Sequence, residues 1–361
     1  MSEILVVTWD GGGNVPPALG IAAELSTRGH HVRFMGHRSQ ADTFADAGVP
    51  FEAFGHARPF TSDAPSGTAA LLGVFADRAM GRDVVDSLAR QPAEVVLVDC
   101  LLFGVMEALR HAGREYAVLE HSFDSYFRRA ARGPMGLLLR LRGARALSLL
   151  DAGRPVLAAT LGELDPGAGP VVHTGPVLGT LPASACAPPA RPAVLLSLST
   201  FAFRSLVPTW QRLLDAVDGL PARVVATTGP AVDATALRIP ANVEHHTWLS
   251  HAEVMTEVCL VVGHGGHATT MAALAHDLPL LVLPLDPKTD QPLVGRAIQD
   301  RGAGRTLSRR SSPQAIRTAI EDLLEDGPHR QAAARLGAKI RATPGAPLAA
   351  EQIEKLLTAA R

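Results

Sequence analysis

The sequence predicts an α/β protein built from two Rossmann-like halves that face each other across a cleft. Apolar runs of strand length alternate with helical patterns, which is typical of βαβ units and a parallel sheet. The 361 residues are many for one hydrophobic core and suit two domains of ordinary size. A Pro/Ala-rich stretch over 176–192 interrupts the alternation, because its prolines can continue neither a helix nor a central strand. We therefore expect a first domain over 1–175, a linker over 176–192 and a second domain over 193–345.

Each half repeats the same order of elements. In the first half we expect strands at 4–8, 31–35, 95–98 and 117–119, and helices at 17–28, 40–47 and 103–112. In the second half we expect strands at 193–198, 223–227 and 243–245, and helices at 206–217, 313–325 and 329–342. A final helical pattern covers 349–357.

Composition narrows the class of protein. The net charge of −1 and the lack of a recognised DNA-binding motif argue against nucleic acid as a partner. The three cysteines, Cys100, Cys186 and Cys259, are scattered, and we expect buried thiols rather than metal ligands. The chain enters its first apolar strand without a leader-like segment, and no run is long enough to span a bilayer. We expect a cytoplasmic protein without stable membrane insertion.

The most informative segment is a glycine-rich turn between an apolar run and a helix. The run over 258–262 is followed by Gly263-His264-Gly265-Gly266-His267 and then by a helix rich in Ala, Met and Leu. Glycines let backbone N–H groups approach a ligand, and the positive helix end favours phosphate. We expect His264, Thr269 and Thr270 to add donors to the phosphate oxygens. An ordinary tight turn is the alternative, and the Asp290-Gln291 pair after the next apolar run weighs against it.

This segment resembles the donor-site signature of family 1 glycosyltransferases, in the macrolide-glycosyltransferase-like branch of actinobacterial natural-product enzymes. The family pattern is HGGxGT, EAL, GVPxLxxP and DQ in chain order. It stands here as 264–269, Ala272-Ala273-Leu274, Leu278-Pro279 and Asp290-Gln291. The resemblance implies the GT-B fold, with the C-terminal helix, 346–361, returning to the first domain.

Two departures from the signature matter. Ala268 replaces the second family glycine, which is a mild change. Ala272 replaces the family glutamate that grips a ribose diol. Because a 2′-deoxyribose has no diol, an apolar residue at this position fits a dTDP-sugar better than a UDP-sugar.

The resemblance implies further donor contacts. Thr200 ends the first strand of the second half and would meet the diphosphate, although Ser/Thr runs also form ordinary turns. Trp248 and Leu249 match the loop that holds the base, with a plain core tryptophan as the alternative. Asp290 and Gln291 would bind sugar hydroxyls unless they form a solvent-facing acidic loop. The donor site we expect comprises Thr200, Trp248, Leu249, His264, Gly265, Gly266, His267, Thr269, Thr270, Asp290 and Gln291.

The first βα turn is the second informative segment. Its sequence, 10–19, places three glycines where open α/β sheets bind ligands, although a flexible turn would look the same. Related transferases carry GHxxP here, and their histidine deprotonates the acceptor hydroxyl. Aligned on Pro17, that position is Asn14, and an amide cannot take a proton near neutral pH. We expect Asn14 to hold the acceptor hydroxyl without acting as the base.

Three residues remain candidates for the general base. Asp99 falls at a strand end where family members carry the aspartate that orients the catalytic histidine. Asp10 lies in the glycine loop, and His121 ends another strand of the same sheet. We rank Asp99 first, Asp10 second and His121 third, since a strand-end carboxylate facing a cleft can have a raised pKa. A phenolic acceptor would need little help from a base.

The acceptor side is less defined. Aromatic residues gather over 51–72 and 123–150, and we expect Gly12, Gly13, Phe60, Phe123 and Tyr126 to line an apolar acceptor pocket. The same region carries an arginine series among leucines: Arg128, Arg129, Arg132, Arg140, Arg142 and Arg145. A solvated helix face is the favoured interpretation, and a membrane-surface helix is the alternative.

Together, these expectations predict an inverting glycosyltransferase of the hexosyltransferase type. It would move a deoxysugar from a nucleoside diphosphate, dTDP by preference, to a hydrophobic natural product. We expect no bound cofactor and no required metal, and a homodimer is possible. A catalytically silent partner of another transferase and a GT-B nucleotide-sugar epimerase are the alternatives, the first because of Asn14.

Overall fold

The computed structural model describes residues 1–62, 67–165, 167, 169–179, 181–182, 191–325 and 327–359. The chain forms two compact units. Unit 1 comprises Met1–Ser62, the described residues from 67 to Val177, and the chain from Pro344; unit 2 comprises the described part of Leu178–Thr343. Cys186 and most of the expected linker, namely 180 and 183–190, lie outside the described residues.

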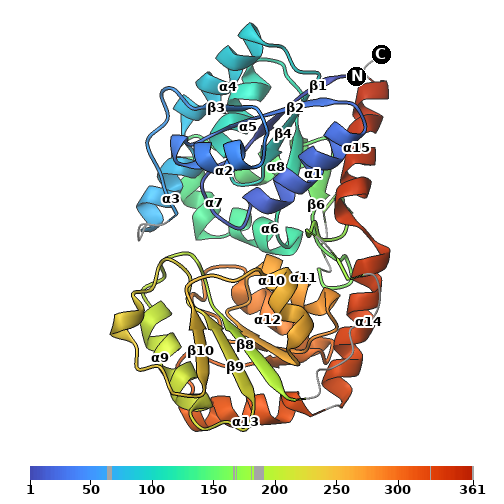
Figure 1. Cartoon of the computed structure of the whole chain (residues 1–361). Helices are drawn as coiled ribbons and strands as arrows, with labels where there is room; N and C mark the ends of the chain where they lie inside the picture. Colours follow the sequence, from blue (N-terminus) through green and yellow to red (C-terminus); the bar gives the residue numbers. More distant parts are fainter. Residues whose placement is uncertain are drawn as a thin grey trace. The chain divides into compact units, whose positions relative to one another are not determined.

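Unit 1 is built on a seven-stranded parallel sheet in the order β3-β2-β1-β4-β5-β6-β7 (Figure 1). The strands are β1 (Glu3–Val7), β2 (His31–Gly36), β3 (Phe51–Ala53), β4 (Val95–Asp99), β5 (Ala117–Glu120), β6 (Val156–Ala158) and β7 (Val171–His173). The helices are α1 (Val15–Thr27), α2 (Ala41–Asp46), α3 (Thr68–Phe75), α4 (Arg78–Arg90), α5 (Phe103–His111), α6 (Asp124–Arg132), α7 (Pro134–Leu141), α8 (Ala146–Ala152) and α15 (Gly345–Ala359), with a 3-10 turn η1 (Arg38–Gln40).

Both faces of this sheet are covered, as β1 illustrates. Ile4 and Val6 are buried against α1, α2 and α15, whereas Leu5 and Val7 are buried against α4, α5 and α8. Successive strand residues point to opposite faces, so a strand buried on both sides must be apolar throughout. This explains the uninterrupted apolar run at 4–7.

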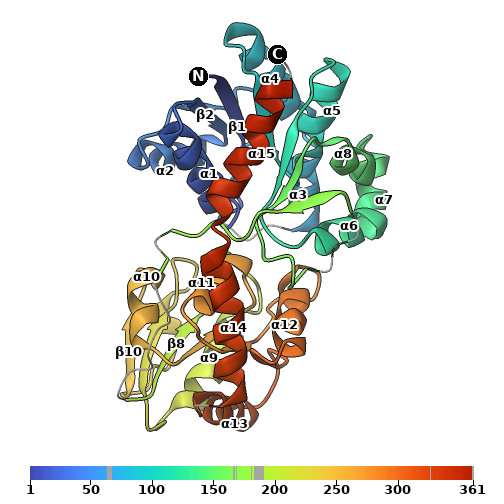
Figure 2. The same cartoon turned by 90° about the vertical axis from the view of Figure 1, so that its right-hand side faces the viewer.

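The C-terminal helix α15 belongs to unit 1, where Figure 2 shows it alongside α1. Ile353 joins the core on the α1 side of the sheet. The Arg28 guanidinium bonds Glu354 at 2.8 Å, and it also donates to the carbonyl of Pro347 at 3.2 Å. Apolar burial and this partly exposed ion pair therefore fix the helix against α1.

Unit 2 is built on a six-stranded parallel sheet in the order β10-β9-β8-β11-β12-β13. The strands are β8 (Ala193–Ser197), β9 (Arg223–Thr227), β10 (Val243–His246), β11 (Leu260–Gly263), β12 (Leu280–Val282) and β13 (Gly304–Thr306). The helices are α9 (Leu206–Val217), α10 (His251–Val254), α11 (His267–Ala275), α12 (Gln291–Asp300), α13 (Pro313–Leu324) and α14 (Pro328–Ala342), with 3-10 turns η2 (Ala234–Ala236) and η3 (Met255–Glu257).

Helices α9 and α13 share one core with this sheet, in which Trp210 and Ile320 are completely buried. Helix α14 packs closely on α11: a Cβ at Gly337 would lie 2.2 Å from the carbonyl oxygen of Leu274. The predicted α/β class with two parallel-sheet halves is confirmed. The strands β3, β6, β7 and β13 and the helices α3, α4, α6, α7, α8, α10 and α12 were not predicted. The four strands have only three residues each, too few to show an alternating pattern.

The arginine series is only partly a solvated face. Arg128 is 4% exposed and bonds Asp124 at 2.6 Å and Asp151 at 2.5 Å, so the expectation was wrong for this residue. The other five arginines are exposed: Arg129, Arg132, Arg140, Arg142 and Arg145. Within the described ranges, no helix has the length and apolar character needed to cross a membrane.

Candidate active site

The carboxyl ends of the unit 2 strands form one row across the sheet. Pairing places His246 opposite Thr227, Thr227 opposite Ser197, and Ser197 opposite Gly263. Gly263 in turn pairs with Val282. Ligands bind at this edge in open parallel sheets, so the loops after these strands are the candidate donor site.

The turn after β11 requires its glycines. Gly265 has a φ of +87°, and a Cβ there would lie 2.8 Å from the Gln291 carbonyl oxygen. A Cβ at Gly266 would meet the His264 ring at 2.6 Å. Gly266 is the N-cap of α11 and has no side chain to satisfy the first-turn N–H groups. The positive end of α11 can therefore receive an anion.

His264 lies in this turn as a neutral group. Burial lowers its pKa to about 4, so the imidazole carries no charge near neutral pH. Its Nδ1 is buried and has no hydrogen-bond partner among the described residues. A neutral imidazole can still donate one hydrogen bond to a phosphate oxygen.

The other side chains expected to contact the phosphate differ in their exposure to solvent. Thr269 and His267 are half-buried in the first turn of α11, and Thr200 is exposed after β8. Thr270 is only 1% exposed, on a face of α11 that packs into the unit. The expectation that Thr270 donates to a ligand was wrong, because its side chain is buried within the unit.

Trp248 lies in the loop after β10 and is 73% exposed. This excludes the alternative of a core tryptophan. Leu249 beside it is half-buried. An exposed indole at the carboxyl edge of a sheet offers a flat apolar face on which a nucleotide base can stack.

Gln291 has a structural role that the sequence did not suggest. It is 3% exposed, and its Oε1 accepts the N–H of Leu285 at 2.7 Å and that of Asp286 at 3.2 Å. These two bonds occupy Oε1 with the loop after β12, so the expected contact of Gln291 with a sugar hydroxyl stays a prediction for the Nε2 donor. Asp290 is half-buried at the N-cap of α12.

In unit 1, Asp99 at the end of β4 gathers four donors. Its Oδ1 accepts from Trp9 Nε1 at 3.2 Å and from the N–H of Leu101 at 3.0 Å. Its Oδ2 accepts from Asn14 Nδ2 at 3.0 Å and lies 3.3 Å from His121 Nδ1. With 5% of its surface exposed, this carboxylate is a fixed acceptor at the centre of the cluster.

Asn14 is held in one orientation. Its Nδ2 also lies 3.0 Å from Thr8 Oγ1 and 3.1 Å from the Trp9 carbonyl oxygen. Three acceptors around one nitrogen assign the amide, because the opposite orientation would set oxygen against oxygen. The Oδ1 atom is therefore defined, and it is buried with no partner among the described residues.

His121 follows β5 and reaches the same carboxylate from the neighbouring strand. Its side chain is 18% exposed and packs edge-on against Phe127, with ring centroids 5.3 Å apart.

Cys100 Sγ lies 3.8 Å from the Nδ1 atom of His121. Burial raises the pKa of Cys100 well above its usual range, so it stays a thiol. The ligand atoms of Asp99, Cys100 and His121 lie within 4.8 Å of one another, close enough to hold a metal ion.

Asp10 has a different environment. Its carboxylate accepts the hydroxyls of Ser39 at 2.7 Å and Ser62 at 3.1 Å. These bonds tie the first βα turn to neighbouring loops. Gly12, with a φ of +77°, and Gly13 have open space where a Cβ would stand.

Aromatic residues surround the Asp99 cluster. Trp9, the one whose side chain bonds Asp99, was not singled out from the sequence. Trp9 packs against Phe60 and Phe75 at centroid distances of 5.6 and 5.3 Å while its indole N–H bonds Asp99. Its position between β1 and the glycine loop is the sequence feature that could have identified Trp9 as a site residue. Phe60 and Tyr126 are half-buried, but Phe123 is 0% exposed. The expectation that Phe123 lines a pocket was wrong, because it is a core residue.

Glu120, beside His121, is a second buried carboxyl that the sequence did not single out. It is 0% exposed, and burial together with the nearby Asp124 raises its pKa well above the usual range. Its environment in the folded protein therefore favours the protonated, uncharged form of this carboxyl.

Comparison with known proteins covers both units. Residues 211–356 match the family model of the erythromycin biosynthesis protein CIII-like C-terminal domain. The 4′-demethylrebeccamycin synthase of Lentzea aerocolonigenes is 27% identical, with 99% of this chain and 100% of that protein covered.

Solved structures show the same fold. The glycosyltransferase of kitacinnamycin has a TM-score of 0.77 at 22% identity, covering 98% of each chain. Glycosyltransferase VinC in complex with dTDP has a TM-score of 0.74 at 20% identity, covering 99% of this chain and 98% of that one. The predicted GT-B fold is confirmed. The chain is therefore similar to a glycosyltransferase of natural-product biosynthesis over its whole length, and residues 211–356 carry the match to the family model.

Proposed function

We propose that this protein is an inverting glycosyltransferase that moves a sugar from a nucleoside diphosphate to a hydrophobic acceptor. The observation that carries the proposal is the glycine turn of unit 2. It leaves the N-terminus of α11 uncapped at the carboxyl edge of a parallel sheet. In a glycosyltransferase family, the anion that fits this position is the diphosphate of the donor.

Each donor group then has a separate task. The N-terminus of α11 stabilises the negative charge of the leaving diphosphate, which is the electrostatic part of catalysis. His264 donates a hydrogen bond as a neutral imidazole. The exposed indole of Trp248 stacks on the base, and the exposed Thr200 completes the phosphate contacts.

The donor nucleotide we propose is dTDP. Ala272 lies half-buried in α11 and offers no hydrogen bond to a ribose diol. A 2′-deoxyribose loses nothing at such a position, whereas a ribose leaves a hydroxyl without its usual partner. The dTDP held by VinC, a protein of the same fold, supports this choice.

We propose His121 as the general base and Asp99 as its positioning residue. Both oxygens of Asp99 already accept hydrogen bonds, and Oδ2 lies 3.3 Å from His121 Nδ1, so the carboxylate is placed to orient the imidazole. Asp10 is likewise engaged by two serine hydroxyls. An imidazole whose Nδ1 proton is held by a carboxylate has its basic lone pair on Nε2.

The proposed step is a single displacement. The acceptor oxygen bonds to the anomeric carbon, the bond from that carbon to the diphosphate breaks, and the configuration inverts. The hydroxyl proton moves to His121 Nε2. The Oδ1 of Asn14, which has no partner among the described residues, accepts a hydrogen bond from a second donor group of the acceptor, because the reacting hydroxyl gives its one proton to His121.

No metal takes part in the proposed reaction, because α11 supplies the electrostatic stabilisation. Turnover should therefore survive a strong chelator. A metal requirement would point to Asp99, Cys100 and His121, whose ligand atoms converge. Activity lost with chelator and restored by zinc, and absent in Cys100→Ser, would overturn this part of the proposal.

A catalytically silent partner of another transferase is the second candidate. The observation that favours it is Asn14 at the position of the family base, held firmly by three acceptors. Turnover by the purified protein alone decides between the two. The assay combines dTDP-sugars with a panel of phenolic and macrolide acceptors and identifies products by mass spectrometry. A glycosylated acceptor supports the transferase, an altered nucleotide-sugar supports an epimerase, and binding without turnover supports the silent partner.

A further inference from the structure

We propose that α7 and the arginines around it dock unit 1 on an anionic lipid bilayer. The surface consists of three exposed leucines and the exposed arginines near them, and we call it the α7 patch. Its leucines are Leu137, Leu138 and Leu141, and its arginines are Arg58, Arg78, Arg140 and Arg142, which line a pocket with Leu141. Three further exposed arginines flank α7 in the chain: Arg129, Arg132 and Arg145. The proposal is independent of the reaction proposed above.

The leucines are not part of the core. Leu137, Leu138 and Leu141 are 60%, 40% and 77% exposed. Their spacing of one, three and four residues places them on one face of α7. The opposite face already packs inward through Gly136 and Leu139, both buried. Helix α7 therefore has a satisfied inner face and a second apolar face in contact with water.

The chain segment that carries this face has charges of one sign. Between residues 125 and 150 there is no aspartate or glutamate, although the whole chain has a net charge of −1. Arg128 of this stretch is neutralised by the buried Asp124 and the partly exposed Asp151. Basic groups beside exposed apolar side chains match the two layers of a membrane interface, anionic headgroups above acyl chains.

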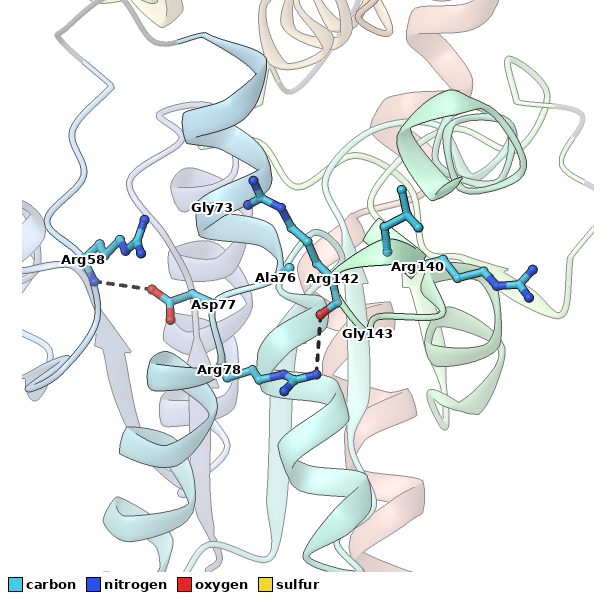
Figure 3. Close-up of a pocket in the computed structure, with 9 residues that line it drawn as sticks. Arg58, Gly73, Ala76, Asp77, Arg78, Arg140, Arg142 and Gly143 are labelled. Carbon is cyan, nitrogen blue, oxygen red and sulfur yellow. Dashed lines mark hydrogen bonds between the residues drawn. The ribbon is translucent and has the colours of Figure 1, made fainter. Parts of the chain in front are cut away.

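A pocket beside the leucines adds a place for headgroups. It is an open pocket of about 640 Å³, lined by four arginines, Arg58, Arg78, Arg140 and Arg142, together with Leu141 (Figure 3). Asp77 is the one acid of its lining. That carboxylate already accepts from the N–H groups of Ala79 at 2.8 Å and Arg58 at 3.3 Å. Guanidinium groups suit phosphate oxygens because they donate in a planar fork.

The same charge argues against a second copy of the chain as the occupant. A two-fold interface would place the patch against itself, arginine facing arginine. Nucleic acid would accept the arginines but would leave the three leucines against polar backbone. An anionic bilayer can bind both kinds of side chain, because the leucines enter the acyl region and the arginines bind the headgroups. Each interaction alone is weak, and the two together make the binding stable.

The test is flotation of the full-length protein with vesicles. We expect binding to phosphatidylcholine vesicles that contain phosphatidylglycerol, weaker binding as salt is raised, and little binding to phosphatidylcholine alone. Each arginine near a charged surface changes partitioning about fivefold, so the double variant Arg140→Gln/Arg142→Gln should bind roughly 25-fold less. The variant Leu137→Ser/Leu138→Ser/Leu141→Ser should lose binding while keeping its melting temperature.

Matched controls come from unit 2. Val207 is 37% exposed on α9, and the side chain of Arg238 is 82% exposed. Val207→Ser and Arg238→Gln should bind like the unaltered protein. The proposal is wrong if phosphatidylglycerol in the vesicles does not increase binding of the protein. It is also wrong if the control substitutions reduce binding as much as the α7 substitutions do. It is equally wrong if gel filtration shows a dimer that the triple leucine variant dissociates, since the patch then contacts a second copy.

Discussion

Asn14 and His121 bond the same oxygen atom. Asp99 Oδ2 lies 3.0 Å from Asn14 Nδ2 and 3.3 Å from His121 Nδ1. Asn14 begins the first helix and His121 follows the fifth strand, so the carboxylate joins two elements of unit 1. An imidazole that meets a carboxylate is therefore present even though the family histidine is replaced by an amide.

Replacing His121 should reduce turnover strongly. His121→Gln should lower kcat by on the order of 10²–10⁴, the usual span for loss of a general base, with little change in donor KM. The acid limb of the pH profile, which reports protonation of the base, should disappear with it. Steady-state kinetics across pH measures both effects.

Two variants serve as comparisons for His121. Asp99→Asn should shift the pH profile as well as lower kcat, because the carboxylate positions the ring. Asn14→Ala should cost less than His121→Gln, since only a positioning hydrogen bond is lost. Unchanged kcat in His121→Gln would return the role of base to Asp99 or Asp10.

His264 should control donor binding. A nucleoside diphosphate should raise the melting temperature of the protein by mass action, and His264→Ala should largely abolish that shift. His264→Gln should keep part of it because an amide still donates a hydrogen bond. His111→Ala is the control, since the His111 side chain is 72% exposed on α5 in unit 1. An equal shift in all variants would remove His264 from the site.

Ala272 should set the nucleotide preference. We expect dTDP to bind at least as tightly as UDP in the unaltered protein. Ala272→Glu should move the preference toward UDP by roughly tenfold or more, because a site that bonds a hydroxyl discriminates against its absence. Calorimetry with both nucleotides measures the ratio, and a strong UDP preference before substitution would contradict the idea.

Glu120 should make folding stability depend on pH. Its pKa is raised in the folded protein, so the folded state holds a proton that the unfolded chain releases above its ordinary value of 4.5. The free energy of unfolding should therefore fall as pH rises above that value, by up to about 1.4 kcal/mol per pH unit for this group. Glu120→Gln, which mimics the protonated acid, should remove that slope.

The control for this measurement is Glu351→Gln, an exposed carboxyl on α15. Denaturant unfolding between pH 5 and 8 should show the same slope for that variant as for the unaltered protein. A slope that persists in Glu120→Gln would assign it to other buried groups.

The sequence by itself determined the features whose causes are local. Alternating apolar runs marked the central strands, because a strand covered on both faces must be apolar along its length. The Gly263–Gly266 turn was readable because Gly265 needs a positive φ and Gly266 has no room for a Cβ. The departures at Asn14 and Ala272 were visible for the same reason, since each stands at a fixed place in a motif.

Only the tertiary structure decided which side chains meet and which are buried. Asp99 and His121 lie 22 positions apart on neighbouring parallel strands, and that pairing is a property of the sheet. Burial reversed the expected roles of Thr270, Phe123 and Arg128, and the loop after β12 occupies the Oε1 of Gln291. The exposure of the α7 leucines reversed the usual expectation for an apolar helix face. Periodicity says that residues share a face, but only the packed neighbours decide whether that face meets the core or the solvent.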